Sequence, residues 1–453
     1  MLAVLLLSGS LLAAGAAINA RGALAAEPGV GVSPSSAVQL ASVHSLGTHW
    51  VRIFVSWRSL QPSPGALSPS AVSSYEQVFK ALPAHTKVIL DVVGSPEWET
   101  GSGNEYAPPA NPNDYAAFVG GLAEHFGTRV SAYEIWNEED SSTFWAGGPN
   151  PAAYAQLLKA TYPVLKAADP SATVVLGGLT GNDYPFLEEV YAAGAKGSFD
   201  VVAVHTDTAC NVLSPYVFLR GPEGRMVPDS FLAYREVHAV MLANGDDKPI
   251  WMTELSWRTT SATCSEGAWA GQKPQGVSEP EQATFLRQAY HCLAQDSYVQ
   301  VALWFAMQDE GPVVSGLLRA DGSRKPSFTA MRSYVRKGDT LSEPCGTFSG
   351  PKIKVLSPSN HVSYRGPLPI HVMAMSPLGV YRIKLEIDGK VIRNYGTSAD
   401  PARLTGVINW QGAKHISFGR HTLTFIAYDK ELNTSRVSIT VYHRRPLSGR
   451  PRG

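Results

Sequence analysis

The sequence has no excess of charge of either sign, because 38 Lys and Arg residues balance 38 Asp and Glu residues in a chain of 453. A neutral chain has no electrostatic attraction for nucleic acid or an anionic membrane, so neither is an expected partner. The basic cluster in the tail, residues 444–453, is interpreted as a flexible chain end. The chain also lacks a Walker loop, a GxGxxG turn after its first strand, an HExxH helix and a GxSxG elbow. We therefore expect no metal and no organic cofactor.

Cysteine is scarce, with four residues and neither a CxxC pair nor histidines at zinc-binding spacing. Cys210 and Cys264 lie in loops after two successive predicted strands, and Cys292 and Cys345 lie in or near the last two predicted helices. This placement favours the disulfides 210–264 and 292–345. Four buried free thiols remain the alternative.

Long apolar runs are missing beyond the N-terminus. Residues 1–17 are almost wholly apolar and are followed by small residues up to position 26, which predicts a secretory signal peptide over residues 1–26. No Lys or Arg precedes this run, so a short N-terminal anchor is the alternative. The run is too short and too interrupted for a stable membrane span. We expect a secreted or cell-surface protein.

Eight short apolar segments alternate with amphipathic helices after this leader. Such alternation predicts a parallel sheet, and eight units predict an α/β fold with a closed (β/α)8 TIM barrel, here over residues 27–338. The expected strands are Gly29–Val32, Trp50–Phe54, Lys87–Val92, Ala132–Trp136, Thr173–Leu176, Val201–Val204, Ile250–Met252 and Val299–Trp304.

The pattern changes after a linker over residues 339–350. Segments in residues 351–443 alternate apolar and polar side chains, which predicts a small all-β immunoglobulin-like sandwich. Asp388-Gly389, between two such segments, predicts a tight hairpin. The sequence leaves open whether this module binds carbohydrate or acts as a spacer.

Two predicted barrel strands lead into a glutamate. Strand four runs into Trp136-Asn137-Glu138, and strand seven into Thr253-Glu254. The carboxyl ends of barrel strands meet at one mouth, so Glu138 and Glu254 are expected to face each other there. Two facing carboxylates repel, which keeps one protonated while the other is ionised. That is the equipment for cleaving a glycosidic bond.

Other residues of these strands have supporting roles in this interpretation. Arg52 stands inside the apolar strand two and needs a buried carboxylate partner, either Glu254 or a structural acid such as Glu134 or Asp91. Glu134 is too deep in strand four to reach the mouth and is assigned to a structural pair.

The remaining candidates are polar or aromatic residues expected at the mouth. Asn137 is placed to bind a sugar hydroxyl, and His205 ends strand six, where a structural role and a place in the site are equally supported. Aromatic candidates for stacking on sugar rings are Trp304, at the end of strand eight, Trp98 and Trp257. Glu139 and Asp140 are interpreted as a solvated loop.

Together these residues resemble glycoside hydrolase clan A, the retaining glycosidases that carry the acid/base on strand four and the nucleophile on strand seven. Trp136-Asn137-Glu138 is similar to the clan's strand-four motif, and Arg52, His205 and Trp304 match its supporting positions. Family 39-like bacterial endoglycosidases are the nearest resemblance, with family 5 cellulases second. The resemblance implies that Glu138 is the acid/base, Glu254 is the nucleophile, and a poly- or oligosaccharide is the substrate.

Two positions depart from the pattern of the clan. Proline usually follows the acid/base, but here the residue is Glu139. Family 39 often has His-Pro-Tyr after strand six, whereas this chain has His205-Thr206-Asp207. The missing tyrosine would have bonded the nucleophile, and Tyr216 and Asp207 are the candidates to replace it. These departures keep a second hypothesis open, a non-catalytic carbohydrate-binding or surface adhesion protein on a degenerate glycosidase barrel.

Overall fold

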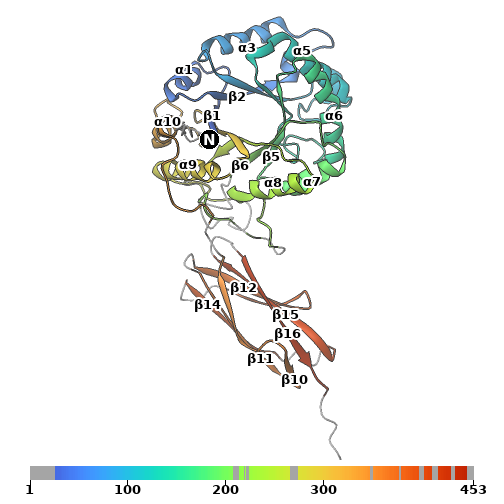
Figure 1. Cartoon of the computed structure of the whole chain (residues 1–453), viewed down its shortest axis with the longest axis vertical. Helices are drawn as coiled ribbons and strands as arrows, with labels where there is room; N and C mark the ends of the chain where they lie inside the picture. The colour runs from blue at the N-terminus through green and yellow to red at the C-terminus, as the bar shows by residue number, and fades with distance from the viewer. Residues whose placement is uncertain are drawn as a thin grey trace, which may run out of the picture.

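The computed structural model describes residues 26–207, 214–218, 220, 224–265, 274–346, 350–376, 379–396, 402–410, 417–429 and 434–445. Eight parallel strands form a closed barrel in the order β1 to β8, and β1 pairs with β8 to complete it. Figure 1 shows the helices arranged in a ring around these strands, with the all-β domain as a separate lobe. The predicted barrel followed by an all-β domain is confirmed.

The barrel strands match the expected apolar segments closely, and several extend further at the carboxyl end. They are β1 (Glu27–Gly31), β2 (Trp50–Ser56), β3 (Lys87–Val93), β4 (Ala132–Ile135), β5 (Thr173–Thr180), β6 (Val201–Asp207), β7 (Ile250–Ser256) and β8 (Val299–Trp304).

The helices that cover the barrel carry clear start signals in the sequence. The Ser68, Asn150 and Ser278 side chains each accept a backbone N–H at a helix start, with proline in the first turn. The helices are α1 (Ala37–Leu46), α2 (Trp57–Leu60), α3 (Pro69–Ala81), α4 (Glu97–Thr100), α5 (Pro112–Phe126), α6 (Pro151–Ala168), α7 (Tyr184–Ala192), α8 (Tyr234–Ala243), α9 (Glu279–Ala294) and α10 (Pro326–Lys337), with short 3-10 turns η1 (Gly127–Arg129) and η2 (Phe231–Ala233).

The C-terminal domain consists of two sheets that share one apolar core, to which β11, β12 and β15 contribute most of the buried side chains. The five-stranded sheet has the order β10-β16-β15-β12-β13 and the three-stranded sheet the order β14-β11-β9. Asp388 and Gly389 both have positive φ, 49° and 80°, and form the predicted hairpin between β12 and β13. The strands are β9 (Lys352–Ser357), β10 (Val362–Tyr364), β11 (Leu368–Met375), β12 (Val380–Ile387), β13 (Lys390–Tyr395), β14 (Arg403–Trp410), β15 (Gly419–Asp429) and β16 (Thr434–His443).

The segment between the domains is fastened to the barrel. The predicted disulfide Cys292–Cys345 joins α9 to this segment and is confirmed. His291 Nδ1 lies 2.7 Å from Asp339 Oδ2 in the same segment. Cys264 is disulfide-bonded as well, and Cys210, its expected partner, lies outside the described residues. The linker therefore begins as a clamped extension of the barrel.

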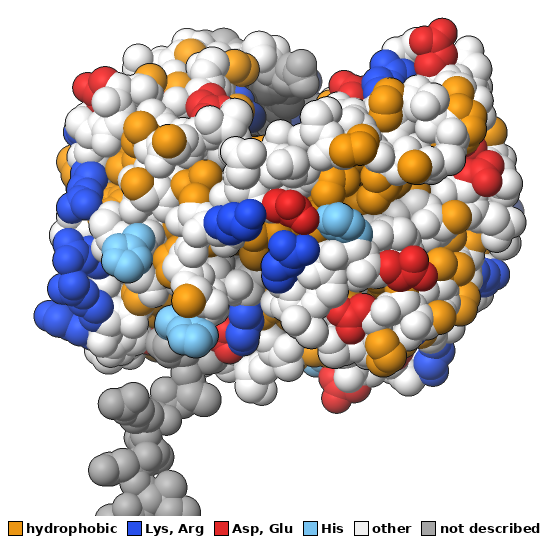
Figure 2. All heavy atoms as spheres, turned by 90° about the horizontal axis from the view of Figure 1, so that it is seen from above, with side chains coloured by type: hydrophobic (Ala, Val, Ile, Leu, Met, Phe, Trp, Pro, Cys, Tyr) orange, Lys and Arg blue, Asp and Glu red, His pale blue; other side chains and the backbone are white. Residues whose placement is uncertain are grey.

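In the described part of the chain, no helix combines the length and the apolar character needed to cross a membrane. Figure 2, which views the molecule from above, shows side chains of both charges interspersed with apolar ones on a face hollowed by a notch. On this face Lys and Arg side chains gather along the left edge, and the Asp and Glu side chains lie mostly towards the middle and right.

Candidate active site

The turn after β4 aims Glu138 into the barrel mouth. Trp136 and Glu138 both have positive φ angles, 70° and 45°, which residues other than glycine rarely adopt. The Trp136 N–H donates to Val92 O at 3.2 Å, and its indole N–H donates to Phe144 O at 2.7 Å. A strained backbone held by surrounding bonds is a feature of functional sites. Here it places the Glu138 carboxylate on the wall of a cavity of about 250 Å³.

Arg52 is the centre of the charge network, and its side chain is buried. Its guanidinium donates to Glu134 Oε2 and Glu254 Oε1 at 2.6 Å each, to Asp91 Oδ2 at 2.9 Å and to Asn137 Oδ1 at 2.8 Å. Burial alone would lower the pKa of Arg52, but Glu134, Asp91 and Glu254 together raise it above its usual value. The two expected partnerships, with Glu254 and with the structural acids, are both present.

His205 links the other side of the same network. Its Nδ1 lies 2.8 Å from Glu138 Oε1 and its Nε2 lies 3.1 Å from Thr253 Oγ1, which in turn donates to Glu134 Oε1 at 2.8 Å. Burial would lower the pKa of His205, but Glu254, Glu134 and Glu138 raise it well above its ordinary value. His205 is therefore a second buried cation near neutral pH.

The acids around these two cations differ in the direction of their pKa shifts. Burial raises the pKa of Asp91 well above its ordinary value, although the Arg52 guanidinium opposes this rise. Burial would also raise the pKa of Glu134, but Arg52 and His205 outweigh burial and hold it below its ordinary value. Arg52 and His205 thus lie between the structural acids and the pair Glu138 and Glu254, and each cation contacts one member of that pair.

Glu138, His205 and Glu254 each have a side-chain N or O atom within 4.8 Å of those of the other two. Burial raises the pKa of Glu254 and Glu138 adds to the rise, whereas His205 and Arg52 oppose it. A trio this close has the spacing of metal ligands. However, both ring nitrogens of His205 are already bonded, to Glu138 and Thr253, so the arrangement is better suited to proton transfer.

Two consecutive glycines of β5 make room for buried polar groups. A Cβ on Gly178 would lie 1.9 Å from His205 Nε2, and one on Gly177 would lie 2.2 Å from Glu139 Oε2. The pairing of β5 with β6 shifts register at this point, between Leu176 and Leu179. Glycine is therefore required at both positions, because any side chain there would collide with His205 or Glu139.

The expectation that Glu139 and Asp140 form a solvated loop is wrong for Glu139, whereas Asp140 is partly exposed. Glu139 is fully buried, and neither of its oxygens has a hydrogen-bond partner among the described residues. Burial raises the pKa of Glu139 well above its ordinary value, and Asp140 adds to the rise, so burial favours the protonated form. Burial and the neighbouring Asp183 raise the pKa of Asp140 to about 7, although this carboxylate accepts bonds from the Thr180 N–H and hydroxyl.

The aromatic wall of the cavity differs from the one expected. Trp304 and Trp257 are buried behind it, where their rings pack 6.1 Å apart. The Trp98 indole N–H donates to Gln61 O at 2.9 Å, and Trp98 is not among the described residues that line the cavity. Phe54, Phe144 and Phe305 line it instead.

The sequence contained a signal for one of these three rings. Phe305 directly follows the last residue of β8, so it was one position away from the candidate that the strand-end rule selected. Val301 and Leu303 belong to the interior cluster of the barrel, so alternation along β8 turns Trp304 outward and places Phe305 on the interior side.

Of the two candidates to replace the missing tyrosine, Tyr216 bonds a residue other than the nucleophile. The Tyr216 hydroxyl donates to Glu343 Oε1 at 3.0 Å, in the segment between the domains. The side chain of Asp207 lies outside what the structure describes. The bond to Glu254 comes from Arg52. Of the predicted site residues, the structure thus brings together Glu138, Glu254, Asn137, Arg52 and His205, and it places the three tryptophans elsewhere.

Comparison with known proteins identifies the fold of this chain. No family model and no curated protein matches the chain, but many solved structures do. A family 39 glycoside hydrolase from Bacteroides cellulosilyticus WH2 is 19% identical with a TM-score of 0.55, covering 85% of this chain and 79% of that one. A monomeric β-xylosidase from Caulobacter crescentus CB15 is 15% identical with a TM-score of 0.53, covering 85% and 94%. A GH5_18 protein from Streptomyces cattleya, solved with GlcNAc, is 18% identical with a TM-score of 0.51, covering 70% and 81%. The chain shares the barrel fold of these clan A families, as the sequence resemblance predicted.

Proposed function

We propose that the protein is a retaining glycoside hydrolase that cleaves O-glycosidic bonds in a poly- or oligosaccharide. The observation that carries this proposal is the close approach of Glu138 and Glu254 on a cavity wall, with side-chain atoms within 4.8 Å. Retaining enzymes hold their two carboxyl groups about 5–5.5 Å apart, whereas inverting enzymes leave about 6.5–9.5 Å for a water molecule. The separation therefore favours direct attack by one carboxylate.

In the first step, Glu138 protonates the oxygen of the leaving group while Glu254 attacks the anomeric carbon. The C–O bond to the leaving group breaks as the bond between the anomeric carbon and Glu254 forms. The Arg52 guanidinium, 2.6 Å from Glu254 Oε1, stabilises this carboxylate before attack and when it departs again. Glu138 then removes a proton from water, which attacks the same carbon and releases Glu254.

His205 has a positioning role in this scheme. Its Nδ1 lies 2.8 Å from Glu138 Oε1, so the ring fixes the orientation of the acid/base. Asn137 lines the cavity beside Glu138, and Arg52 holds its carboxamide oxygen at 2.8 Å, which leaves the amide N–H groups to face a sugar hydroxyl. The supporting groups around the pair would thus be preorganised before substrate binds.

The activity is tested with an activated 2-deoxy-2-fluoro glycoside, which slows the second step and traps the covalent intermediate. A panel of 2-fluoro β-xylosides and β-glucosides is appropriate, because a β-xylosidase is among the structural neighbours. A 5-fluoro N-acetyl-β-glucosaminide extends it to GlcNAc, which occurs in the complex of another neighbour and whose C2 carries the acetamido group. We expect the label on Glu254, located by peptide mass spectrometry. Label on another residue from a competent substrate would contradict the assignment.

The second test separates the acid/base from the nucleophile. Glu138→Gln should lose at least about 100-fold in kcat/KM on substrates with poor leaving groups and far less on 2,4-dinitrophenyl glycosides, which need no proton. Glu254→Gln should lose activity on both, because it removes the nucleophile. Glycan binding without hydrolysis across a broad panel would instead favour the non-catalytic carbohydrate-binding or adhesion protein. Export through the leader over residues 1–26 completes the proposal.

A further inference from the structure

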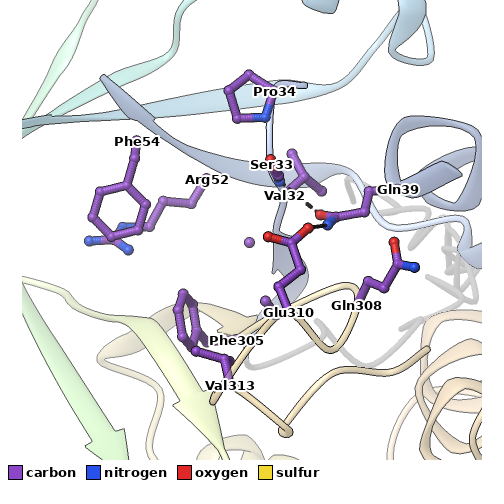
Figure 3. Close-up of a pocket in the computed structure, with 12 residues that line it drawn as sticks. Val32, Ser33, Pro34, Gln39, Arg52, Phe54, Phe305, Gln308, Glu310 and Val313 are labelled. Carbon is purple, nitrogen blue, oxygen red and sulfur yellow. Dashed lines mark hydrogen bonds between the residues drawn. The ribbon is translucent and has the colours of Figure 1, made fainter. Parts of the chain in front are cut away.

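A second cavity of about 240 Å³ lies next to the catalytic one and is nearly equal to it in volume. The two cavities share the side chains of Phe54, Phe305 and Val313 as common wall. Figure 3 shows Arg52 and Phe54 on one side of this second cavity and Gln39 and Gln308 on the other, with Glu310 between them. Its lining comes from the segment after β1, from β2, from α1 and from the segment after β8.

The polar end of this cavity is built around a buried amide. Gln39 is only 1% exposed, and its Oε1 accepts the Ser33 N–H at 2.8 Å. That bond fixes the amide so that Nε2 donates to Glu310 Oε1. The turn that carries Glu310 is closed by two backbone bonds of 2.9 Å with Val313. Glu310 is exposed, and its carboxylate is held on one side by Gln39, so it is an oriented acceptor for hydroxyl groups.

The opposite end of the cavity is apolar. Phe54 and Phe305 are half-buried and present ring surface to it, and Val313 and Pro34 complete this side. The Arg52 guanidinium stacks 4.7 Å from the centre of the Phe54 ring and fixes its plane. An apolar ring surface opposite a fixed hydrogen-bond acceptor matches a sugar, which has an apolar face and a rim of hydroxyls.

The position of the second cavity relative to the catalytic pair shows on which side of the cleaved bond it lies. The catalytic cavity extends past Glu138 to Thr180 and Asp229, on the side of β4 to β6. The second cavity touches none of these three residues and lies beyond Arg52, on the side of β1 and β8. A leaving group must lie beside its proton donor, so the chain beyond Glu138 is the leaving-group side. The second cavity therefore lies on the other side of the cleaved bond.

We propose that this cavity, with the fixed pair Gln39 and Glu310, binds a second, neutral sugar unit of the glycone, so that the enzyme recognises at least two sugar residues before the cleaved bond. The inference rests on the proposed function and makes it more specific. A uronic acid at this position would be repelled by Glu310 and is excluded from the substrate class. An enzyme of this kind cuts a chain or removes disaccharides, instead of removing single terminal sugars.

The test compares matched 4-nitrophenyl β-glycosides with one or two glycone sugars: xyloside with xylobioside, glucoside with cellobioside, and N-acetylglucosaminide with diacetylchitobioside. For the pair that is cleaved, kcat/KM for the disaccharide should exceed that for the monosaccharide by about tenfold to a hundredfold. Glu310→Ala and Gln39→Leu should each reduce this ratio by about tenfold. Glu124→Ala, an exposed glutamate on α5, is the matched control and should keep the ratio.

The outcomes separate the two proposals. Equal rates within a cleaved pair, or a disaccharide gain that survives both Glu310→Ala and Gln39→Leu, would overturn the second subsite and leave the glycosidase intact. No hydrolysis in any pair would count against the glycosidase. In that case saturation-transfer NMR with free xylobiose, cellobiose and diacetylchitobiose tests the cavity alone. Binding that Glu310→Ala removes would support it, and absence of binding would overturn it.

Discussion

The interior of the barrel contains two layers of opposite character, built from the same strands. In five of these strands, an apolar residue is followed two positions later by a polar one. Side chains alternate along a strand, so both members of each such pair face the interior. The pairs are Trp50 and Arg52, Ile89 and Asp91, Ala132 and Glu134, Ala203 and His205, and Trp251 and Thr253.

The lower layer is a dry apolar cluster in which Trp50 and Trp251 pack edge to face at 4.9 Å. The upper layer is a network of ion pairs and hydrogen bonds with Arg52 and His205 at its centre. Apolar burial stabilises a fold, whereas a buried charge costs desolvation that only good geometry offsets. The lower layer therefore holds the barrel together, and the upper layer fixes the groups that do chemistry.

The largest effect on the upper layer is expected from Arg52→Met, which keeps the length and apolar volume of the side chain but removes its charge. Glu134 and Glu254 would be left without their cation, which costs about 3–5 kcal/mol of unfolding free energy, and activity should be lost with it. Urea denaturation measures the first effect and glycoside hydrolysis the second. Arg336→Met, at the exposed end of α10, is the matched control. A stable and active Arg52→Met protein would show that the upper layer does not depend on this cation.

A second test concerns Glu139, the buried acid behind the upper layer. Its pKa is raised in the folded protein, so folding favours the protonated form, and its contribution to stability falls as pH rises above the ordinary value of 4.5. Glu139→Gln removes this pH dependence. Relative to the native protein, the variant should gain about 1.4 kcal/mol for each pH unit above that value until Glu139 ionises. Little difference is expected at pH 4.

Thermal unfolding followed from pH 4 to pH 9 measures this gain. Glu124→Gln on the exposed side of α5 provides the control and should show no such trend. Parallel melting curves for native protein and Glu139→Gln at every pH would mean that Glu139 is ionised in the folded state.

The lower layer and the strand order were accessible from the sequence because they follow from local pattern. Apolar runs of four to seven residues between helical segments predict buried parallel strands. Capping residues such as Ser68 and Asn150 mark helix starts, because their side chains bond a backbone N–H within the first turn. The meeting of Glu138, Glu254, Arg52 and His205 follows from the same pattern, since strand ends in a closed barrel share one mouth.

What could not be predicted depends on register and depth. Trp304 and Phe305 are neighbours in sequence, and which one lines the cavity depends on which face of β8 points inward, the face of Val301 and Leu303. Glu139 was predicted in a solvated loop because glutamate is rarely buried without a partner. It can be buried because Gly177, in another strand, has no side chain to occupy that space. The Gln39 and Glu310 contact joins residues 271 positions apart, a pairing that no local pattern encodes.

The smallest expected effect refines the lower layer itself. Trp251→Phe removes part of a buried ring, and the lost packing and the small cavity are destabilising. The buried Trp251 indole N–H has no hydrogen-bond partner in the described structure, so its removal offsets part of that loss. The net cost should be about 1–2 kcal/mol, with kcat/KM within about twofold of native because Thr253 and Glu254 above it keep their bonds. Hydrolysis rates and urea denaturation are measured on the same sample. A large loss of activity at nearly native stability would show that packing in the lower layer controls the geometry of the upper layer.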